Sequence, residues 1–127
     1  MSSIKVGLIS DTHGLLRPEA AAALQDCSII LHAGDIGEGV LEKLRRTADT
    51  VVAVKGNTDM WPWSKNLRLT EQVEIEGLKF FIVHNLAQFG AVPADVDVVV
   101  HGHTPLELRA GGWGLVHQPR QRRPSPL

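Results

Sequence analysis

The sequence predicts an α/β fold in which mixed β-sheets are flanked by helices. Five apolar, β-branched runs have the composition of buried strands, and helical patterns separate the first three of them. This alternation is typical of parallel βαβ units with right-handed crossovers. In the second half of the chain, short strand patterns are separated by turns, which favours antiparallel hairpins.

The first half of the chain carries three predicted strands and two predicted helices. The strands share apolar, β-branched content and comprise residues 4–10, 29–33 and 51–54. The first helix covers residues 17–25, because Pro18 is tolerated in a first turn and Glu19 suits the N-terminal end of the helix dipole. The second helix covers residues 40–48. Its apolar side chains share one face: Val40, Leu41, Leu44 and Ala48.

The second half begins with a predicted hairpin. Val73 and Ile75 alternate with charged residues, Glu76 and Gly77 form a predicted turn, and residues 78–83 return as a more buried strand. Three more strand patterns follow, at residues 98–100, 106–109 and 113–116. The last two form a second predicted hairpin.

Every apolar run ends in a side chain that can bind a metal. These side chains are Asp11, His13, Asp35, Asn57, His84 and His103. If the runs lie side by side, the carboxyl ends of the strands converge, which is where ligands gather in open α/β sheets. The mixed oxygen and nitrogen set suits manganese, iron, zinc, cobalt or nickel. Two such ions that share a carboxylate are the usual machinery for in-line displacement at phosphorus.

Length and composition favour one soluble globular domain. At 127 residues, with 43% hydrophobic and 21% charged side chains, the chain is long enough for one core and too short for two. A formal net charge of -1 gives no general attraction to nucleic acid or to an anionic membrane. Cys27 is the only cysteine, so no intrachain disulfide can form. The apolar run before Asp11 is too short for a signal peptide or a membrane span, and we therefore expect a cytoplasmic protein.

Five motifs follow one another at successive strand ends: Asp-x-His, Gly-Asp, Gly-Asn, His and Gly-His. This ordered set resembles that of the calcineurin-like metallophosphoesterase superfamily. Within it, the chain is most similar to small phosphodiesterases of the YfcE type, over about residues 4–116. The resemblance implies an αββα sandwich of mixed β-sheets flanked by helices, with C-terminal strands missing. Residues 1–116 then form the metallophosphoesterase domain, and residues 117–127 form a Pro/Arg-rich tail.

The tail is expected to be disordered or the product of a frameshift. Its prolines and arginines leave no strand periodicity. One choice of codons for residues 118–122, read one base later, encodes Asn-Pro-Gly-Ser, the turn that relatives carry at this place. Loss of the strands that follow would expose a sheet edge, through which we expect a homo-oligomer to form.

The resemblance also implies the roles of the site residues. The metal ligands are Asp11 and His13 for a first ion, Asp35 as the bridge, and Asn57, His84 and His103 for a second ion. Asp35, Asn57 and His84 are then the catalytic residues. The implied function is that of a metal-dependent phosphoesterase, preferring diesters, in which a metal-bridging hydroxide attacks the phosphorus of a small phosphorylated substrate. Manganese is the first expectation for both ions, with nickel, iron, zinc, cobalt and magnesium as alternatives.

Three positions depart from the family pattern. Pro105 follows Thr104 where relatives carry a second histidine of the first metal site, so we expect that site to be under-occupied. Asn85 follows His84 in place of glycine, and Thr58 stands where some members place a histidine that serves as general acid. The rival hypothesis is a catalytically weak or inactive protein-binding scaffold, as in the small subunit of the retromer sorting complex.

Five other side chains near the predicted site have structural interpretations. His32 is expected to be a core residue or to support a ligand, and His101 to be structural. Asp59 either orients a metal water or a ligand histidine, or is a solvated loop carboxylate. Trp61 and Trp63 favour packing or a dimer contact over stacking on an aromatic leaving group.

Overall fold

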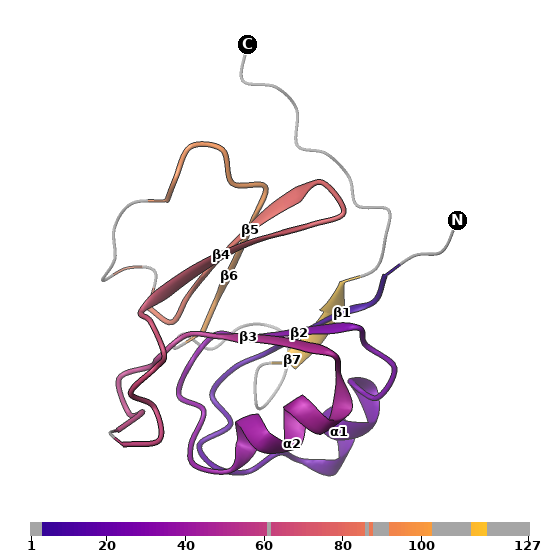
Figure 1. The fold of residues 1–127 in the computed structure, drawn as a ribbon, viewed down its shortest axis with the longest axis vertical. Coiled ribbons are helices and arrows are strands. Elements are labelled where there is room, and N and C mark those ends of the chain that lie inside the picture. The colour runs from indigo at the N-terminus through magenta and orange to yellow at the C-terminus, as the bar shows by residue number, and fades with distance from the viewer. Residues whose placement is uncertain (1–3, 61, 86, 88–91, 103–112, 117–127) are drawn as a thin grey trace.

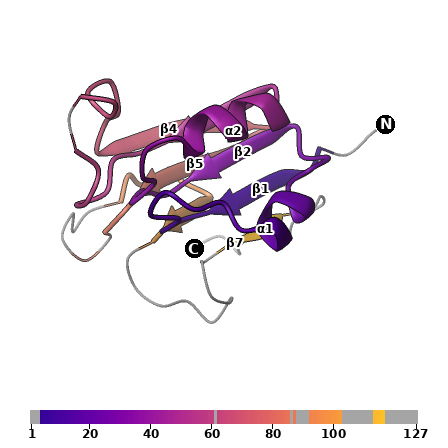
Figure 2. The ribbon, with the colours of Figure 1, turned by 90° about the horizontal axis from the view of Figure 1, so that it is seen from below.

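The computed structural model describes residues 4–60, 62–85, 87, 92–102 and 113–116. Two β-sheets are stacked on one another (Figure 1). Helices α1 (Pro18–Ala23) and α2 (Val40–Thr47) lie against the outer face of the first sheet, as the view from below in Figure 2 also shows.

The first sheet has four strands in the order β3-β2-β1-β7. Its members are β1 (Val6–Ile9), β2 (Ile29–His32), β3 (Thr50–Ala53) and β7 (Trp113–Val116). β1, β2 and β3 are parallel and are connected through α1 and α2, which confirms the predicted βαβ units. β7 runs antiparallel to β1 on the other side.

The second sheet has three strands in the order β4-β5-β6. They are β4 (Thr70–Ile75), β5 (Leu78–Val83) and β6 (Val98–His101). β4 and β5 form the predicted antiparallel hairpin, and its turn at Glu76 and Gly77 has φ values of 54° and 82°. Two successive positive φ angles are typical of the type I′ turn that suits a two-residue hairpin. Of the second predicted hairpin, residues 106–109 lie outside the described residues.

The five apolar runs therefore do not lie side by side in one sheet. Three belong to the first sheet and two to the second. Side chains from both sheets form the core between them: Val6, Leu31, Ala33, Val54, Ile75, Phe80, Ile82 and Val100. The carboxyl ends still converge across this core. A Cβ added at Gly34 would lie 2.9 Å from the Cβ of His84, and one added at Gly102 would lie 2.8 Å from Oδ2 of Asp11.

The two helices bury the opposite face of the first sheet. Leu24 and Leu44 are fully buried there, together with Ile30 of β2. Gly7 lets α1 approach β1 closely, because a Cβ at that position would overlap the side chain of Leu24. α1 ends two residues before the predicted end, since the N–H of Gln25 bonds to the carbonyl of Ala22 in a tighter turn.

Three layers of the predicted sandwich lie within the described residues: the helices, the first sheet and the second sheet. The outer face of the second sheet carries a smaller apolar cluster of Phe81, Val83 and Val96. Neither described helix has the length and apolar content needed to cross a membrane. Residues 117–127 lie outside the described part of the chain, so the frameshift and the homo-oligomer stay predictions.

The helix–sheet core yields a stability prediction. Leu44→Ala should lower the free energy of unfolding by about 2–5 kcal/mol, because Leu44 is 0% exposed and its removal leaves a cavity beneath α2. Arg45→Ala, on the exposed side of the same helix, is the control and should change stability little. Urea denaturation of both variants measures the difference, and equal effects would contradict the packing described.

Candidate metal centre

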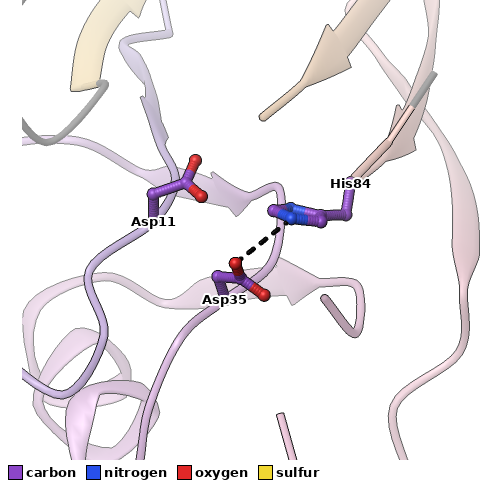
Figure 3. Close-up of side chains that lie close together, drawn as sticks. All are labelled: Asp11, Asp35 and His84. Atoms are coloured by element: carbon purple, nitrogen blue, oxygen red, sulfur yellow. Dashed lines mark ion pairs between the residues drawn. The ribbon is translucent and has the colours of Figure 1, made fainter. Parts of the chain in front are cut away.

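Two carboxylates and one imidazole meet where β1, β2 and β5 end. Asp11 follows β1, Asp35 follows β2 and His84 follows β5, and their side chains point toward one another (Figure 3). One ligand atom of each lies within 4.8 Å of the other two. Nε2 of His84 is 3.3 Å from Oδ2 of Asp35, and both residues are only 4% exposed. These three side chains could hold a metal ion.

His13 joins this group from the solvent side. Its Nε2 lies 3.8 Å from Oδ2 of Asp35 and 4.0 Å from Oδ1 of Asp11, and about half of its side chain is exposed. Asn57 is exposed and lines a hollow together with His84. The structure thus brings four of the predicted site residues together and leaves Asn57 at their margin.

The sixth predicted residue, His103, lies outside the described residues, and its role as a ligand stays a prediction. The residue before it is well placed. The N–H of Gly102 donates to the carbonyl of His84 at 3.0 Å, and any side chain on Gly102 would press against Asp11. The chain therefore passes directly beside the carboxylate of Asp11 at position 102.

The loops that carry the carboxylates adopt a left-handed backbone. Asp11, His13 and Asp35 have φ values of 57°, 48° and 56°. Each such residue costs about 1–3 kcal/mol unless its surroundings hold it. Here the loops after β1 and β2 hold each other through three backbone hydrogen bonds. The N–H groups of Asp11, His13 and Gly14 donate to the carbonyls of Gly34, Asp35 and Ile36 at 2.9, 2.9 and 2.8 Å.

Asp59 is not the solvated loop carboxylate that was one of its two predicted roles, because it is only 6% exposed. Its oxygens accept backbone hydrogen bonds, and the other role, that of orienting a metal water or a ligand histidine, stays a prediction. Oδ1 accepts from the N–H groups of Ile36 at 2.8 Å and Gly37 at 3.1 Å, and Oδ2 accepts from Gly56 at 2.9 Å. This carboxylate joins the Asp35 loop to the loop that carries Asn57.

Thr58 is a functional contact that the sequence did not reveal. Its backbone N–H donates to Oδ1 of Asp35 at 3.0 Å. Burial by itself raises the pKa of Asp35, but the backbone and hydroxyl hydrogen bonds from Thr58, with the charges of His84 and His13, outweigh it and hold the pKa below its usual value. The only sequence signal for this role was the place of Thr58 directly after Asn57.

His32 is a buried core residue, as predicted. Its Nδ1 accepts from the N–H of Gly34 at 3.1 Å, so Nε2 carries the hydrogen and donates to the hydroxyl of Thr12 at 3.0 Å. That hydroxyl donates to the carbonyl of Ile36 at 2.6 Å. Burial, followed by the charge of His84, lowers the pKa of His32 to about 3, which keeps the ring neutral.

The remaining histidine and tryptophan fit their structural interpretations. His101 is half-buried at the end of β6, with Nδ1 3.5 Å from the carbonyl oxygen of Gly102. Trp63 is half-buried and packs against the helix–sheet core, as predicted. Trp61 lies outside the described residues.

The donor set fits a divalent cation. Nδ1 of His84 donates to the carbonyl of Ala33 at 2.8 Å, which directs Nε2 toward Asp35. Metal-binding histidines usually have their second nitrogen anchored in this way. Gly56 leaves room for the carboxylate of Asp35, because a Cβ at position 56 would overlap it. Oxygen and imidazole nitrogen together suit manganese, iron, cobalt, nickel or zinc.

Comparison with known proteins identifies the family. Residues 4–107 match the model of the calcineurin-like phosphoesterase superfamily domain, and the chain belongs to this superfamily. Phosphodiesterase MJ0936 of Methanocaldococcus jannaschii is 28% identical over 122 aligned residues, which cover 80% of this chain and 73% of the relative. The resemblance that the sequence motifs indicated is thereby confirmed.

Two solved structures share the fold. YfcE, a phosphoesterase from E. coli, superimposes with a TM-score of 0.61 and 20% identity, over 88% of this chain and 87% of that chain. Vps29 from Entamoeba histolytica, solved in complex with Zn²⁺, gives a TM-score of 0.63 and 22% identity, over 88% and 72%. The predicted metallophosphoesterase architecture is confirmed by these likenesses.

Asp59 gives a prediction about how the loops are held. Asp59→Asn keeps an oxygen for Ile36 and Gly37 but turns an amide NH₂ toward the N–H of Gly56, so one buried bond is lost. We expect the free energy of unfolding to fall by about 1–3 kcal/mol. Asp49→Asn, at an exposed position, is the control in urea denaturation. Equal stability of the two variants would mean that the Asp59 contacts contribute nothing.

His32 predicts a pH dependence. The pKa of this ring is about 6.5 in the unfolded chain and about 3 in the folded chain. Between these values the unfolded state holds more protons, so stability is fully present above pH 6.5 and is lost as the pH falls. His32→Gln can keep both hydrogen bonds but cannot bind a proton. The free energy of unfolding of this variant should therefore fall less steeply as the pH decreases. Urea denaturation of the chelated protein from pH 7.5 to 5 measures it, and parallel profiles would contradict the burial effect.

Proposed function

We infer that this chain is a metal-dependent phosphodiesterase and that its active site is the cluster of Asp11, His13, Asp35 and His84. One observation carries the inference. Two carboxylates and an anchored imidazole lie within 4.8 Å of one another at the ends of three strands. An arrangement that crowds negative charge in a partly buried place is favourable when a cation occupies it.

The ligand assignment follows from position. Asp35 lies within 3.8 Å of His13 and 3.3 Å of His84, which supports it as the bridge between two ions. Asp11 and His13 would complete the first site. Asn57, His84 and His103 would complete the second. Manganese is the first candidate for both.

The chain's own residues prepare this chemistry. The hydrogen bonds from Thr58 lower the pKa of Asp35 and so further favour the ionised carboxylate, the form that binds a cation. The carbonyl of Ala33 fixes the ring of His84. Divalent ions, when bound, supply the positive charge that activates a water and stabilises the phosphoryl oxygens.

A diester with a good leaving group is the substrate class that the site favours. Thr58 cannot act as a general acid in the way that a histidine can, because its hydroxyl does not titrate near neutral pH. The leaving alkoxide therefore has to depart with little help, which favours phenolic or similarly acidic alcohols. The name of the relative MJ0936, a phosphodiesterase, supports the choice of diester.

A protein-binding scaffold is the second candidate. The likeness to the fold of Vps29, a protein whose full name is Vacuolar Protein Sorting 29, favours it. A scaffold has no need for a bridging carboxylate held ionised or for a left-handed backbone at three ligand positions. These features support the enzyme.

Asp35→Asn tests the proposal. We expect at least a hundredfold loss of manganese-dependent hydrolysis of bis(4-nitrophenyl) phosphate and weaker binding of manganese by the chelated protein, because the charge between the two sites is removed. Asp49→Asn is the matched control, and circular dichroism checks folding. A folded Asp35→Asn variant with full activity would refute the bridging role. A wild-type protein that binds no metal and hydrolyses no ester would favour the scaffold.

A further inference from the structure

Two hollows open beside the candidate metal centre. The first, of about 250 Å³, lies at the end of β1, and its walls include Asp11, His13, Leu15 and Arg17. The second, of about 260 Å³, lies at the end of β3. Its walls include Lys55, Asn57, Leu69 and His84.

The strand order places these hollows on either side of the bridging carboxylate. In the first sheet β2 lies between β3 and β1, and Asp35 follows β2. Asp11 lines only the hollow at the end of β1, and His84 lines only the hollow at the end of β3. A phosphorus atom positioned at Asp35 would therefore have one hollow on each side.

Both hollows share two features, although only the first also contains a carboxylate, that of Asp11. Each contains a largely exposed leucine, Leu15 at 54% and Leu69 at 65%. Each also contains one cationic side chain, Arg17 or Lys55. An apolar wall beside a cation suits an aryl or similar flat group attached to a phosphate, because the wall covers the ring while the cation offsets the phosphate charge.

The volume of each hollow limits how much of a substrate it can hold. Pockets that enclose a whole small molecule usually measure about 300–1,000 Å³, so each of these is better matched to one substituent than to a complete substrate. A phosphodiester has two substituents on phosphorus and a monoester has one. Only the diester can use both hollows.

We propose that the two hollows are paired subsites, each of which takes one ester substituent of an aryl-type phosphodiester, and that they set the preference for diesters. This inference rests on the proposed function. In the reaction a water oxygen bonds to phosphorus, the bond from phosphorus to one alkoxide breaks, and the proton of the water ends on that alcohol. One hollow then holds the released alcohol, and the other holds the substituent that stays on the monoester product.

Filling each hollow separately tests the pairing. Leu15→Trp fills the first hollow and Leu69→Trp fills the second, while Gln72→Trp, at an exposed position that lines neither hollow, is the control. KM is measured with manganese for bis(4-nitrophenyl) phosphate, methyl 4-nitrophenyl phosphate and 4-nitrophenyl phosphate. These esters carry two aryl groups, one aryl and one small group, and one aryl group alone.

Both tryptophan variants should raise KM for the bis-aryl diester about tenfold, the scale of a lost apolar contact in a pocket. Only the variant at the leaving-group side should raise KM for the other two esters, and Gln72→Trp should change none. Where a tryptophan variant fails to fold, the corresponding phenylalanine variant takes its place, since its smaller ring still fills part of the hollow without adding charge.

The outcomes separate the two inferences. Hydrolysis of none of the three esters by the wild-type protein would overturn the proposed function, and the paired subsites with it. Hydrolysis with KM values unchanged by both variants, or changed equally on all three esters, would overturn the paired subsites and leave the proposed function standing.

Discussion

The site depends on the hydrogen bonds that join the loop after β1 to the loop after β2. The N–H groups of Asp11, His13 and Gly14 donate to successive carbonyls of the second loop, so the two chain segments stay hydrogen-bonded beyond the ends of the paired strands. The left-handed backbone at the carboxylate positions would be unfavourable in free loops. Because neither loop can move without the other, the spacing of Asp11 and Asp35 is a property of the polypeptide itself. The positions of the two carboxylates are thus set by backbone hydrogen bonds within the protein.

Two buried polar side chains, His32 and Asp59, also hold the loop that carries Asp35 in place. His32 lies on one side and receives the N–H of Gly34, while Asp59 lies on the other and receives the N–H groups that follow Asp35. Neither side chain belongs to the metal cluster, yet each is buried and hydrogen-bonded to the loop backbone. Burying a histidine or a carboxylate is unfavourable unless its polar atoms are hydrogen-bonded, and the backbone groups of this loop supply those partners. These buried hydrogen bonds therefore favour one conformation of the loop, and that conformation positions Asp35.

Sequence patterns predicted what depends on local periodicity. The alternation of apolar runs with helical patterns gave β1, α1, β2, α2 and β3, and the turn at Glu76 and Gly77 gave the β4–β5 hairpin. Polar residues directly after buried strands predicted that Asp11, Asp35 and His84 would meet. Local patterns do not show how the strands divide between two sheets, because a buried strand has the same pattern in either sheet. The αββα sandwich was predicted from the family resemblance instead. The contacts of Thr58 and Asp59 were missed. Their partners lie more than twenty residues away on the Asp35 loop, and such contacts leave no local pattern.

One consequence of the two-sheet arrangement is that the turn at one end of β5 determines which way the side chain of His84 points at the other end. Side chains of β5 alternate, with Phe80 and Ile82 in the core between the sheets and Phe81 and Val83 on the outer face. His84 continues the inward series and so faces Asp35. A slip of the β4–β5 pairing by one residue would reverse every side chain of the strand and direct His84 outward. The two-residue turn prevents this, because it pairs Ile75 with Leu78 and fixes the register from there to Val83. The position of the imidazole is therefore set by backbone geometry at the far end of the hairpin as much as by its own hydrogen bond to Ala33.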